Sequence, residues 1–238
     1  GGIGLGFVRA LAAAGADIAL WGTNAEKNAA AAEIVKAAGR RVLALTCDVG
    51  EEADVVDAFA RTVDTFGRVD GCFANAGVSG RGAVAFRDMP ADEWRRVMRV
   101  NLDGVFFTFR EAARHMVERG EGGVLVGTAS LAAIEGAPRA EHYAATKGAV
   151  ISMVRSLAVE HARHGIRAHS VLPGWIATDM TARKTNDTRF HDAVMPRIPM
   201  RRWGTGDDFG GIAVYLMSDA SRYHTGDTFV IDGGYSLF

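Results

Sequence analysis

The chain has 238 residues, a length that suits one α/β domain, and apolar residues make up 48% of it, enough for a sizeable core. Its 27 Lys and Arg residues nearly balance 28 Asp and Glu residues, so the charge does not favour nucleic acid or an acidic membrane surface as a partner. The sequence has no apolar run of about 18 residues and no visible secretory signal, so we expect a cytoplasmic protein without a membrane span.

A glycine-rich segment at residues 1–6 runs directly into an apolar helical pattern that ends at Gly15. Glycines at the N-terminus of a helix allow backbone N–H groups to approach a phosphate, whose charge the helix dipole favours. Taken alone, the segment reads more simply as a flexible terminus. The pattern that follows it favours the phosphate-binding interpretation.

Short apolar strands alternate with helices along the chain. We expect strands at 16–21, 42–47, 69–74, 124–127, 166–172 and 228–231, and helices at 24–38, 51–66, 91–115 (two helices), 142–163 and 207–217. This alternation predicts an α/β fold, a single Rossmann-type doubly wound parallel sheet with helices on both faces, in one domain over residues 1–238. Ligands of such sheets bind beyond the C-terminal strand ends, where Gly22, Asp48 and Asn75 lie.

Two local patterns predict how helices begin and meet. Thr23, with Glu26 three residues later, has the spacing of a capping box, so we expect Thr23 to cap the helix that follows. The two helices between 91 and 115 meet near Asn101, which either caps a helix or points a polar group into a site.

Residues 179–205 are polar and contain two prolines, which suggests a mobile segment over the site. The two cysteines, Cys47 and Cys72, lie in apolar runs near strand ends. We therefore expect buried free thiols rather than a disulfide or a metal site.

Tyr143 and Lys147 are four residues apart in a predicted helix, which places them on one face. A phenol has a reference pKa of about 10, and an ammonium within about 4–6 Å favours the phenolate and lowers that pKa. The pair therefore predicts a tuned proton donor and acceptor, although the spacing also arises by chance.

The chain carries a set of short motifs in a fixed order. They are Gly2-Ile3-Gly4, Asp48-Val49, Asn75-Ala76-Gly77, Asn101, Ser130, Tyr143 with Lys147, Pro173-Gly174 with Thr178, and Asp232-Gly233-Gly234-Tyr235. Their order and spacing, including the position of Ser130 13 residues before Tyr143, resemble the short-chain dehydrogenase/reductase family along nearly the whole chain. The resemblance implies an NAD(P)-dependent oxidoreductase that acts on a secondary alcohol or ketone.

The resemblance also implies catalytic roles. Tyr143 passes a proton to or from the substrate oxygen, and Lys147 lowers the Tyr143 pKa and holds the nicotinamide ribose. Ser130 donates a hydrogen bond to the substrate oxygen, and Asn101 holds a water that connects Lys147 to solvent. Cofactor contacts are implied for Gly2, Ile3, Gly4, Thr23, Asn24, Asp48, Val49, Asn75, Ala76, Gly77, Tyr143, Lys147, Pro173, Gly174, Ile176 and Thr178, and no metal site is implied. The alternatives are Asp48 as a turn cap and Thr178 as a helix N-cap.

The chain departs from the family pattern at two points. The Thr-Gly pair that normally opens the glycine motif is absent, and no carboxylate stands at 22–24 to hold the adenosine ribose. The missing carboxylate removes a repulsion against a 2′-phosphate, yet no Arg or Lys stands there to pair with one. We therefore expect use of both cofactors, with a weak lean to NADP(H).

The sequence indicates the type of reaction more clearly than it indicates the substrate. Segments that should surround the nicotinamide contain Glu135, Pro138, Arg139, His142, Trp175, Met180 and Trp203. The aromatic residues and Met180 form either an apolar pocket or core and subunit contacts. Neighbours on a helix point in different directions, so we expect His142 at the surface or an interface rather than in acid–base chemistry with Tyr143.

Two other functions fit the same fold. One is a cofactor-sensing binding protein without turnover, and the other is dehydration or epimerisation with bound cofactor. Retention of Asn101, Ser130, Tyr143 and Lys147 argues against a sensor. The apolar helix at about 102–119 and its neighbour at 142–163 suggest, with the resemblance, a homotetramer.

The family's first strand should precede the glycine motif and lie between the strands at 16–21 and 69–74. Without it, both strands would present unpaired backbone groups to a buried gap, at about 1–3 kcal/mol for each unsatisfied group. We therefore expect an upstream strand of about 5–8 residues. The 16–21 and 69–74 strands should then lie two strand spacings apart and should not pair directly.

Overall fold

The computed structural model describes residues 2–82 and 84–237, so Gly1 of the glycine motif lies outside the described residues. The strands are β1 (Ile18–Gly22), β2 (Val42–Thr46), β3 (Gly71–Ala74), β4 (Gly123–Thr128), β5 (Ile166–Pro173) and β6 (Thr228–Ile231). The helices are α1 (Gly2–Ala13), α2 (Ala25–Ala37), α3 (Glu52–Phe66), α4 (Ala91–Met98), α5 (Gly104–Arg119), α6 (Glu141–His161), α7 (Ala182–Thr185), α8 (Thr188–Val194) and α9 (Gly210–Met217).

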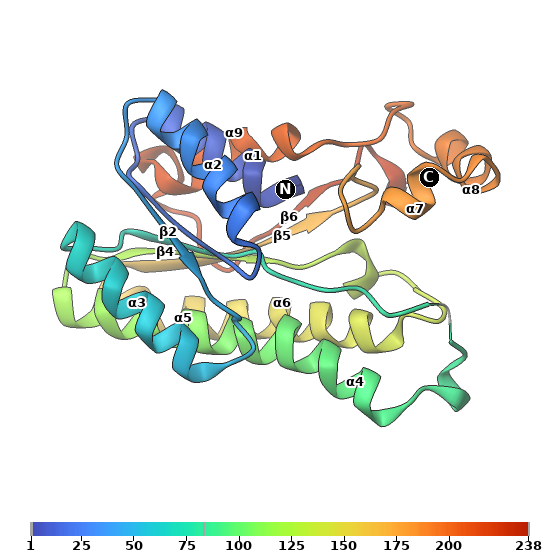
Figure 1. The fold of residues 1–238 in the computed structure, drawn as a ribbon, viewed down its shortest axis with the longest axis horizontal. Helices are drawn as coiled ribbons and strands as arrows, with labels where there is room; N and C mark the ends of the chain where they lie inside the picture. Colours follow the sequence, from blue (N-terminus) through green and yellow to red (C-terminus); the bar gives the residue numbers. More distant parts are fainter. Residues whose placement is uncertain (1, 83, 238) are drawn as a thin grey trace.

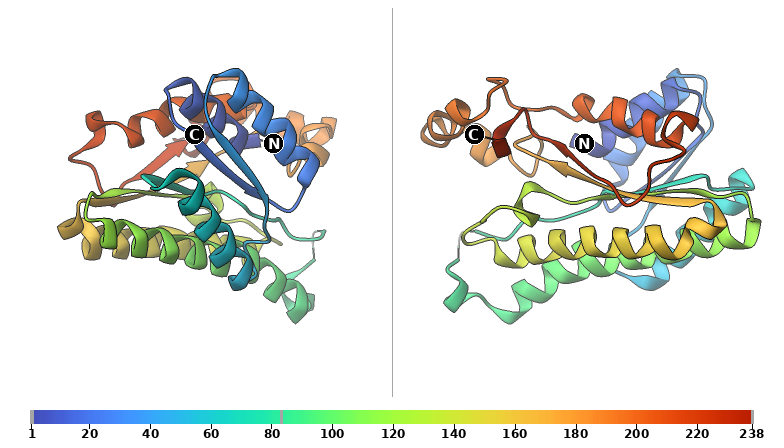
Figure 2. Two further views of the ribbon diagram at one scale, coloured as in Figure 1. Left: turned by 60° about the vertical axis from the view of Figure 1, so that its left-hand side comes forward. Right: turned by 180° about the vertical axis from the view of Figure 1, so that it is seen from behind.

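All strand pairs are parallel, and helices cover both faces of the sheet, as the alternation predicts (Figure 1). The helices α1, α2 and α9 lie on one face, and α3, α5 and α6 lie on the other (Figures 1 and 2). Neighbouring residues of β4 show why: Leu125 packs into the core with α5 and α6, whereas Val126 packs into the core with α1 and α9. Because strand side chains alternate between faces, an unbroken apolar strand supplies both cores.

Within the described part of the chain, the strands form two groups that do not pair with each other. Strands β1 and β2 form one pair, and the other four have the order β3-β4-β5-β6. β1 and β3 therefore do not pair directly in the described chain, as expected if another strand belongs between them. A cavity of about 850 Å³ is lined on one side by Ala19 and Trp21 and on the other by Gly71 and Phe73.

Of the two helix caps compared next, the glycine cap at Gly67 agrees with the sequence prediction and the N-cap at Thr23 does not. Gly67 ends α3 with φ +78°, a left-handed conformation that glycine adopts without strain. The N-cap of α2 is Asn24 rather than Thr23: the Asn24 side chain accepts a hydrogen bond from the backbone N–H of Lys27 at 2.8 Å. The capping-box prediction failed because Asn24 caps as well as Thr23 and stands one position later.

The polar segment 179–205, which the sequence suggests is mobile, contains α7, α8 and a short 3₁₀ helix at Met195–Arg197. Trp203, near the end of the segment, packs against Trp175 with ring centroids 6.3 Å apart. Among the described residues, no helix is long and apolar enough to cross a membrane.

Candidate active site

The predicted proton-transfer residues converge at the C-terminal ends of β4 and β5. Tyr143 and Lys147 lie in α6, with the Lys147 Nζ 5.5 Å from the centre of the Tyr143 ring. The Lys147 ammonium is buried and donates a hydrogen bond to the backbone oxygen of Thr128 at 2.7 Å. Ser130 follows β4, and its side chain is close enough to the Tyr143 hydroxyl for a hydrogen-bonding interaction that lowers the Tyr143 pKa. The helix and the strand end therefore bring the three side chains together.

Burial governs the protonation of this pair. It raises the pKa of Tyr143, and the hydrogen bond from Ser130 opposes that rise only in part. Burial also lowers the pKa of Lys147 to about 8. The expected lowering of the Tyr143 pKa is therefore wrong for this structure. Burial disfavours the charged phenolate, and this desolvation outweighs the interaction with Ser130 that favours it.

Asn101 is completely buried in a π turn (Arg99–Asp103) between α4 and α5, where the sequence predicted that two helices meet. Its side chain accepts from the backbone N–H of Val78 at 2.8 Å and donates to the Val78 oxygen at 2.9 Å. Its Nδ2 also lies 3.4 Å from the Thr146 hydroxyl. The amide thus points into the site, as one of the two alternatives expected, and it fixes the chain just after Gly77.

The glycine motif lies against two other predicted cofactor residues. Gly2 begins α1 with φ +60°, and a Cβ there would lie 2.8 Å from the Thr178 side chain. A Cβ at Gly4 would lie 2.7 Å from the Asn75 amide. The backbone at the start of α1 therefore approaches both strand ends more closely than a side chain allows, which is the geometry that a phosphate loop needs.

Of the other predicted cofactor residues near these strand ends, three line a cavity and one caps a turn. Val49, Ala76 and Asn75 line the same cavity as Gly4. Asp48 accepts from Gly50 N at 2.9 Å and from Arg99 Nη2 at 3.0 Å, so it caps a turn as the alternative supposed. Its carboxylate is only about one third exposed.

Around the end of β5, Gly174 N donates to the Ile231 oxygen, which ties Pro173 and Gly174 to the end of β6. Thr181 bonds the backbone oxygen of Ile176 and the backbone N–H of Thr178. Thr181, and not Thr178, is the N-cap of α7, so the helix-cap alternative for Thr178 is wrong.

The side chains expected near the substrate do not all converge. Trp175 and Trp203 join Phe190 and Tyr235 in a cluster that includes Leu131, next to Ser130. Met180 is exposed, as are Pro138 and Arg139. Glu135 is half-buried. The aromatic residues therefore form a core beside the site, whereas Met180 does not join it.

Two residues at the edges of the site differ from the sequence analysis, which misplaced His142 and did not single out Lys27. His142 is 2% exposed, so its expected surface position is wrong. The loop after Gly77, which no pattern in the sequence could place, covers it. The Lys27 side chain reaches Asp179 at 2.7 Å and so bridges the start of α2 to the segment after Thr178. The sequence did offer a signal for this role, because Lys27 lies in the first turn of a helix that follows the end of a strand.

The site fits a dinucleotide. Gly2 and Gly4 approach Thr178 and Asn75 more closely than a Cβ would allow, and the cavity that Gly4 lines extends to Lys27. Both thiols are free, and burial raises the pKa of Cys47 to about 11 and that of Cys72 to about 12. Among residues 2–82 and 84–237, no group of three or more His, Cys, Asp or Glu side chains is arranged to hold a metal.

Comparison with known proteins agrees with this geometry. Residues 1–236 match a family model described as enoyl-(acyl carrier protein) reductase. The chain is 38% identical to an L-rhamnose 1-dehydrogenase (NAD(P)(+)) of Sphingomonas sp. (strain SKA58), over 97% of this chain and 91% of that protein. It is 37% identical to a 2-dehydro-3-deoxy-D-gluconate 5-dehydrogenase of Dickeya dadantii, over 98% and 91% of the two chains.

Solved structures give the same result. A gluconate 5-dehydrogenase of Burkholderia cenocepacia, in complex with NADP and tartrate, superposes with a TM-score of 0.93 at 35% identity. The superposition covers 100% of this chain and 92% of that one. The chain is thus an NAD(P)-dependent oxidoreductase that transfers a hydride between the cofactor and an alcohol or ketone, and it belongs to the short-chain dehydrogenase/reductase family.

Proposed function

We propose that Tyr143 is the general acid and base of this oxidoreductase, that Ser130 holds the substrate oxygen, and that Lys147 and Asn101 support the proton transfer. The observation that carries the proposal is the convergence of Ser130, Tyr143 and Lys147 at the end of β4. A raised pKa keeps the Tyr143 phenol protonated near neutral pH. The phenol is therefore ready to donate in the direction of ketone reduction.

Each residue has one task in that direction. Ser130 donates a hydrogen bond to the ketone oxygen, and Tyr143 transfers its Oη proton to the same oxygen as negative charge develops. The bound nicotinamide supplies the hydride. Lys147 holds its proton against the Thr128 oxygen beside the phenol, and Asn101 holds a water through which Lys147 reaches solvent. In the oxidative direction the same proton returns to Tyr143.

For the cofactor, Gly2, Ile3 and Gly4 hold the pyrophosphate at the start of α1, and Thr178 holds the carboxamide. Asn75, Ala76 and Gly77 line the middle of the dinucleotide, and Thr23, Asn24, Asp48 and Val49 line the adenosine. Pro173, Gly174 and Ile176 form the wall opposite the nicotinamide. The close approach of Gly2 to Thr178 and of Gly4 to Asn75 supports this assignment.

A weak preference for NADP(H) is part of the proposal. No carboxylate stands at 22–24 to repel a 2′-phosphate. Lys27 lies in the first turn of α2, and its ammonium is exposed, with Asp179 as its ion-pair partner. A phosphate is a stronger partner for an ammonium than an exposed carboxylate is, so Lys27 can exchange one for the other.

The substrate is proposed to be a polyhydroxylated compound, a sugar or a sugar acid. The relatives at 37% and 38% identity are named for 2-dehydro-3-deoxy-D-gluconate and L-rhamnose. The test is a panel of D-gluconate, L-rhamnose and simple secondary alcohols, with NADP⁺ and NAD⁺, followed at the reduced-nicotinamide absorbance band. Cofactor binding without turnover of any compound would favour a non-catalytic sensor and overturn the proposal.

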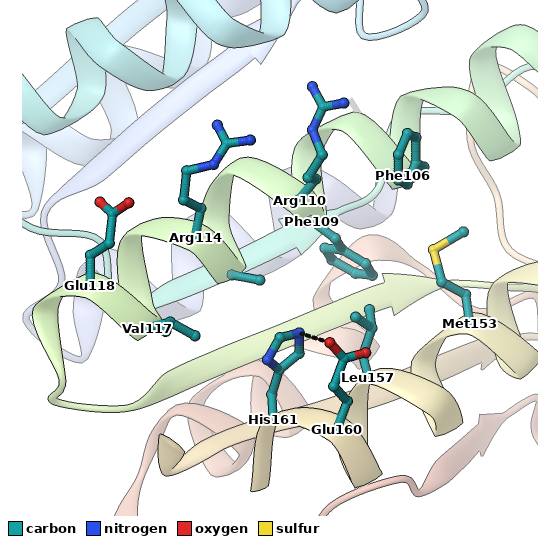
Figure 3. A pocket seen from close by; sticks show the side chains of 11 residues that line it. Phe106, Phe109, Arg110, Arg114, Val117, Glu118, Met153, Leu157, Glu160 and His161 are labelled. Atoms are coloured by element: carbon teal, nitrogen blue, oxygen red, sulfur yellow. Dashed lines mark ion pairs between the residues drawn. The ribbon is translucent and has the colours of Figure 1, made fainter. Parts of the chain in front are cut away.

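A homotetramer with two-fold axes is proposed for the assembly. A groove of about 460 Å³ runs between α5 and α6, with apolar side chains along its floor and charged ones along its edges (Figure 3). The floor includes Phe106, Met153 and Leu157, and the edges carry Arg110, Arg114, Glu118 and Glu160. A second copy turned by 180° would bring arginines of one subunit near glutamates of the other.

A cytoplasmic site of action completes the proposal. Both cysteines are free thiols in the structure, and reduced cysteines are typical of cytoplasmic proteins. One domain, residues 1–238, is proposed to bind the dinucleotide and to carry the catalysis, because both groups of residues share the strand ends described above.

A further inference from the structure

The segment after Gly77 leaves the proton-transfer centre. A Cβ at Gly77 would lie 3.6 Å from the Lys147 Nζ, so the chain passes directly beside that ammonium. One residue later, Val78 is held through both its N–H and its carbonyl oxygen by Asn101. The segment therefore begins in a fixed position next to the catalytic groups.

Helix α4 fixes the next part of the segment through its backbone. Arg96 Nη2 donates to the carbonyl oxygen of Ser79 at 2.7 Å, and Glu93 Oε1 accepts from the backbone N–H of Arg81 at 2.7 Å. Glu93 and Arg96 also pair with each other at 2.8 Å. Hydrogen bonds from Arg96 lower the pKa of Glu93 to about 2, so the pair stays charged across the working range of pH.

The segment also contacts α6: the His142 ring lies directly against Gly80. A Cβ at Gly80 would lie 2.6 Å from the His142 Nε2, which is closer than real contacts allow. Both ring nitrogens of His142 are buried without a hydrogen-bond partner, and Nε2 is 3.7 Å from Glu93 Oε1. The imidazole therefore acts here through its shape and position more than through a directed hydrogen bond.

We propose that His142 is a positioning residue for the substrate: its ring sets how far the segment 78–81 stands from the helix that carries Tyr143. Because His142 and Tyr143 are adjacent in α6, the His142 ring and the Tyr143 phenol move together with that helix. Glycine at position 80 is what allows the backbone to rest on the ring. This inference rests on the proposed role of Tyr143, and it adds the residue that fixes the wall of the substrate site.

The test is a double-mutant cycle of Gly80→Ala, His142→Ala and the two together, with Gly211→Ala as the control. Gly211 has open space where a Cβ would go, so its variant should behave as the wild type. In Gly80→Ala the new methyl pushes the segment outward. The KM for the best panel substrate should rise roughly ten-fold with little change in kcat, as expected when about 1.4 kcal/mol of substrate binding is lost equally from the ground state and the transition state.

In the double variant, the methyl at position 80 occupies space that the imidazole has left. The KM should therefore return most of the way to the wild-type value, which a merely structural loss would not produce. A Gly80→Ala KM equal to the wild-type KM, or a double variant no better than Gly80→Ala, would overturn the inference.

A thermal version of the cycle separates this inference from the proposed function. The melting temperatures of the four proteins should be non-additive, whether or not a substrate is known. If the wild type turns over no panel compound, the proposed function fails by itself, and additive melting temperatures would overturn the contact as well. Non-additive melting temperatures with an unchanged KM would also overturn the inference, because the contact would then support the fold alone.

Discussion

The Tyr143 phenol and the Lys147 ammonium are both withdrawn from water, and this matters more to their chemistry than their spacing along α6. The spacing correctly predicted that they face each other. It could not predict the direction of the Tyr143 pKa, because burial depends on residues such as Ser130 and Thr128 that arrive from β4. Helix spacing fixes the distance between the two groups, whereas the dielectric around them and the cost of desolvation are set by the whole fold.

Removal of the Tyr143 hydroxyl tests its role directly. We expect Tyr143→Phe to lower kcat by at least the roughly 10²–10⁴-fold that general acid–base catalysis contributes. Cofactor binding, measured by the fluorescence of the reduced nicotinamide, should be unchanged. Tyr223→Phe is the matched control because Tyr223 is fully exposed. A Tyr143→Phe enzyme with nearly normal turnover would remove Tyr143 from the proposed mechanism.

Lys27 offers a test of cofactor choice. In Lys27→Gln the ammonium is lost, and a charge-assisted contact with a 2′-phosphate contributes about 1.5–3 kcal/mol. The ratio of kcat/KM for NADP⁺ to that for NAD⁺ should therefore fall about ten-fold or more. Lys36→Gln, at the other end of α2, should leave the ratio unchanged because Lys36 pairs with Glu33 outside the cleft. Equal ratios in the wild type and Lys27→Gln would contradict the assignment.

At the scale of elements, β5 contains a titratable group that the mechanism does not use. His169 is completely buried, with Arg167 at 3.2 Å and Asp227 at 3.7 Å. Burial lowers the pKa of His169 to about 4. The folded state therefore binds fewer protons than the unfolded state between about pH 6.5 and 4, so stability present at neutral pH is lost as the pH falls through that window.

We expect the free energy of unfolding to decrease by up to about 3 kcal/mol between pH 7 and pH 4 from this group alone. Urea unfolding at pH 7 and pH 4, at one protein concentration, measures the decrease. His169→Gln should show a smaller pH dependence. Some dependence will remain because burial also lowers the pKa of His115. An identical dependence in the variant would exclude His169 as its source.

Most elements could be predicted from the sequence because their signals are local. Apolar strands and glycine C-caps such as Gly67 gave boundaries within a few residues of those observed. The failures involve contacts made by distant parts of the chain. The burial of His142 depends on α4 and the segment 78–81, and the helices α7 and α8 form where an aromatic cluster around Trp175 supports them.

At the scale of the whole molecule, the groove between α5 and α6 predicts an interface. Phe106 is 44% exposed within the groove, and Val56 on α3 is 43% exposed outside it. A lysine at position 106 would bury a charge between subunits without a partner. We expect Phe106→Lys to shift sedimentation from a tetramer toward smaller species at micromolar concentration, whereas Val56→Lys should not. A wild-type monomer at that concentration would exclude the proposed assembly.

The gap between β1 and β3 has a consequence for amide hydrogen exchange. The Ile18 N–H donates to Arg41 and so points toward β2, and the Asp70 oxygen accepts from Val124 and so points toward β4. Since successive residues of a parallel strand address opposite neighbours, the N–H groups of Ala19, Trp21, Gly71 and Phe73 point into the gap.

No described strand offers those four groups a partner, whereas their neighbours in sequence are bonded within the sheet. Exchange into deuterated water should therefore alternate along β1 and β3, rapid at one residue and slow at the next. The sequences of β1 and β3 predict central strands, yet both strands should take up deuterium in the pattern of edge strands. A uniformly slow pattern would show that the inner edges of β1 and β3 are covered in solution.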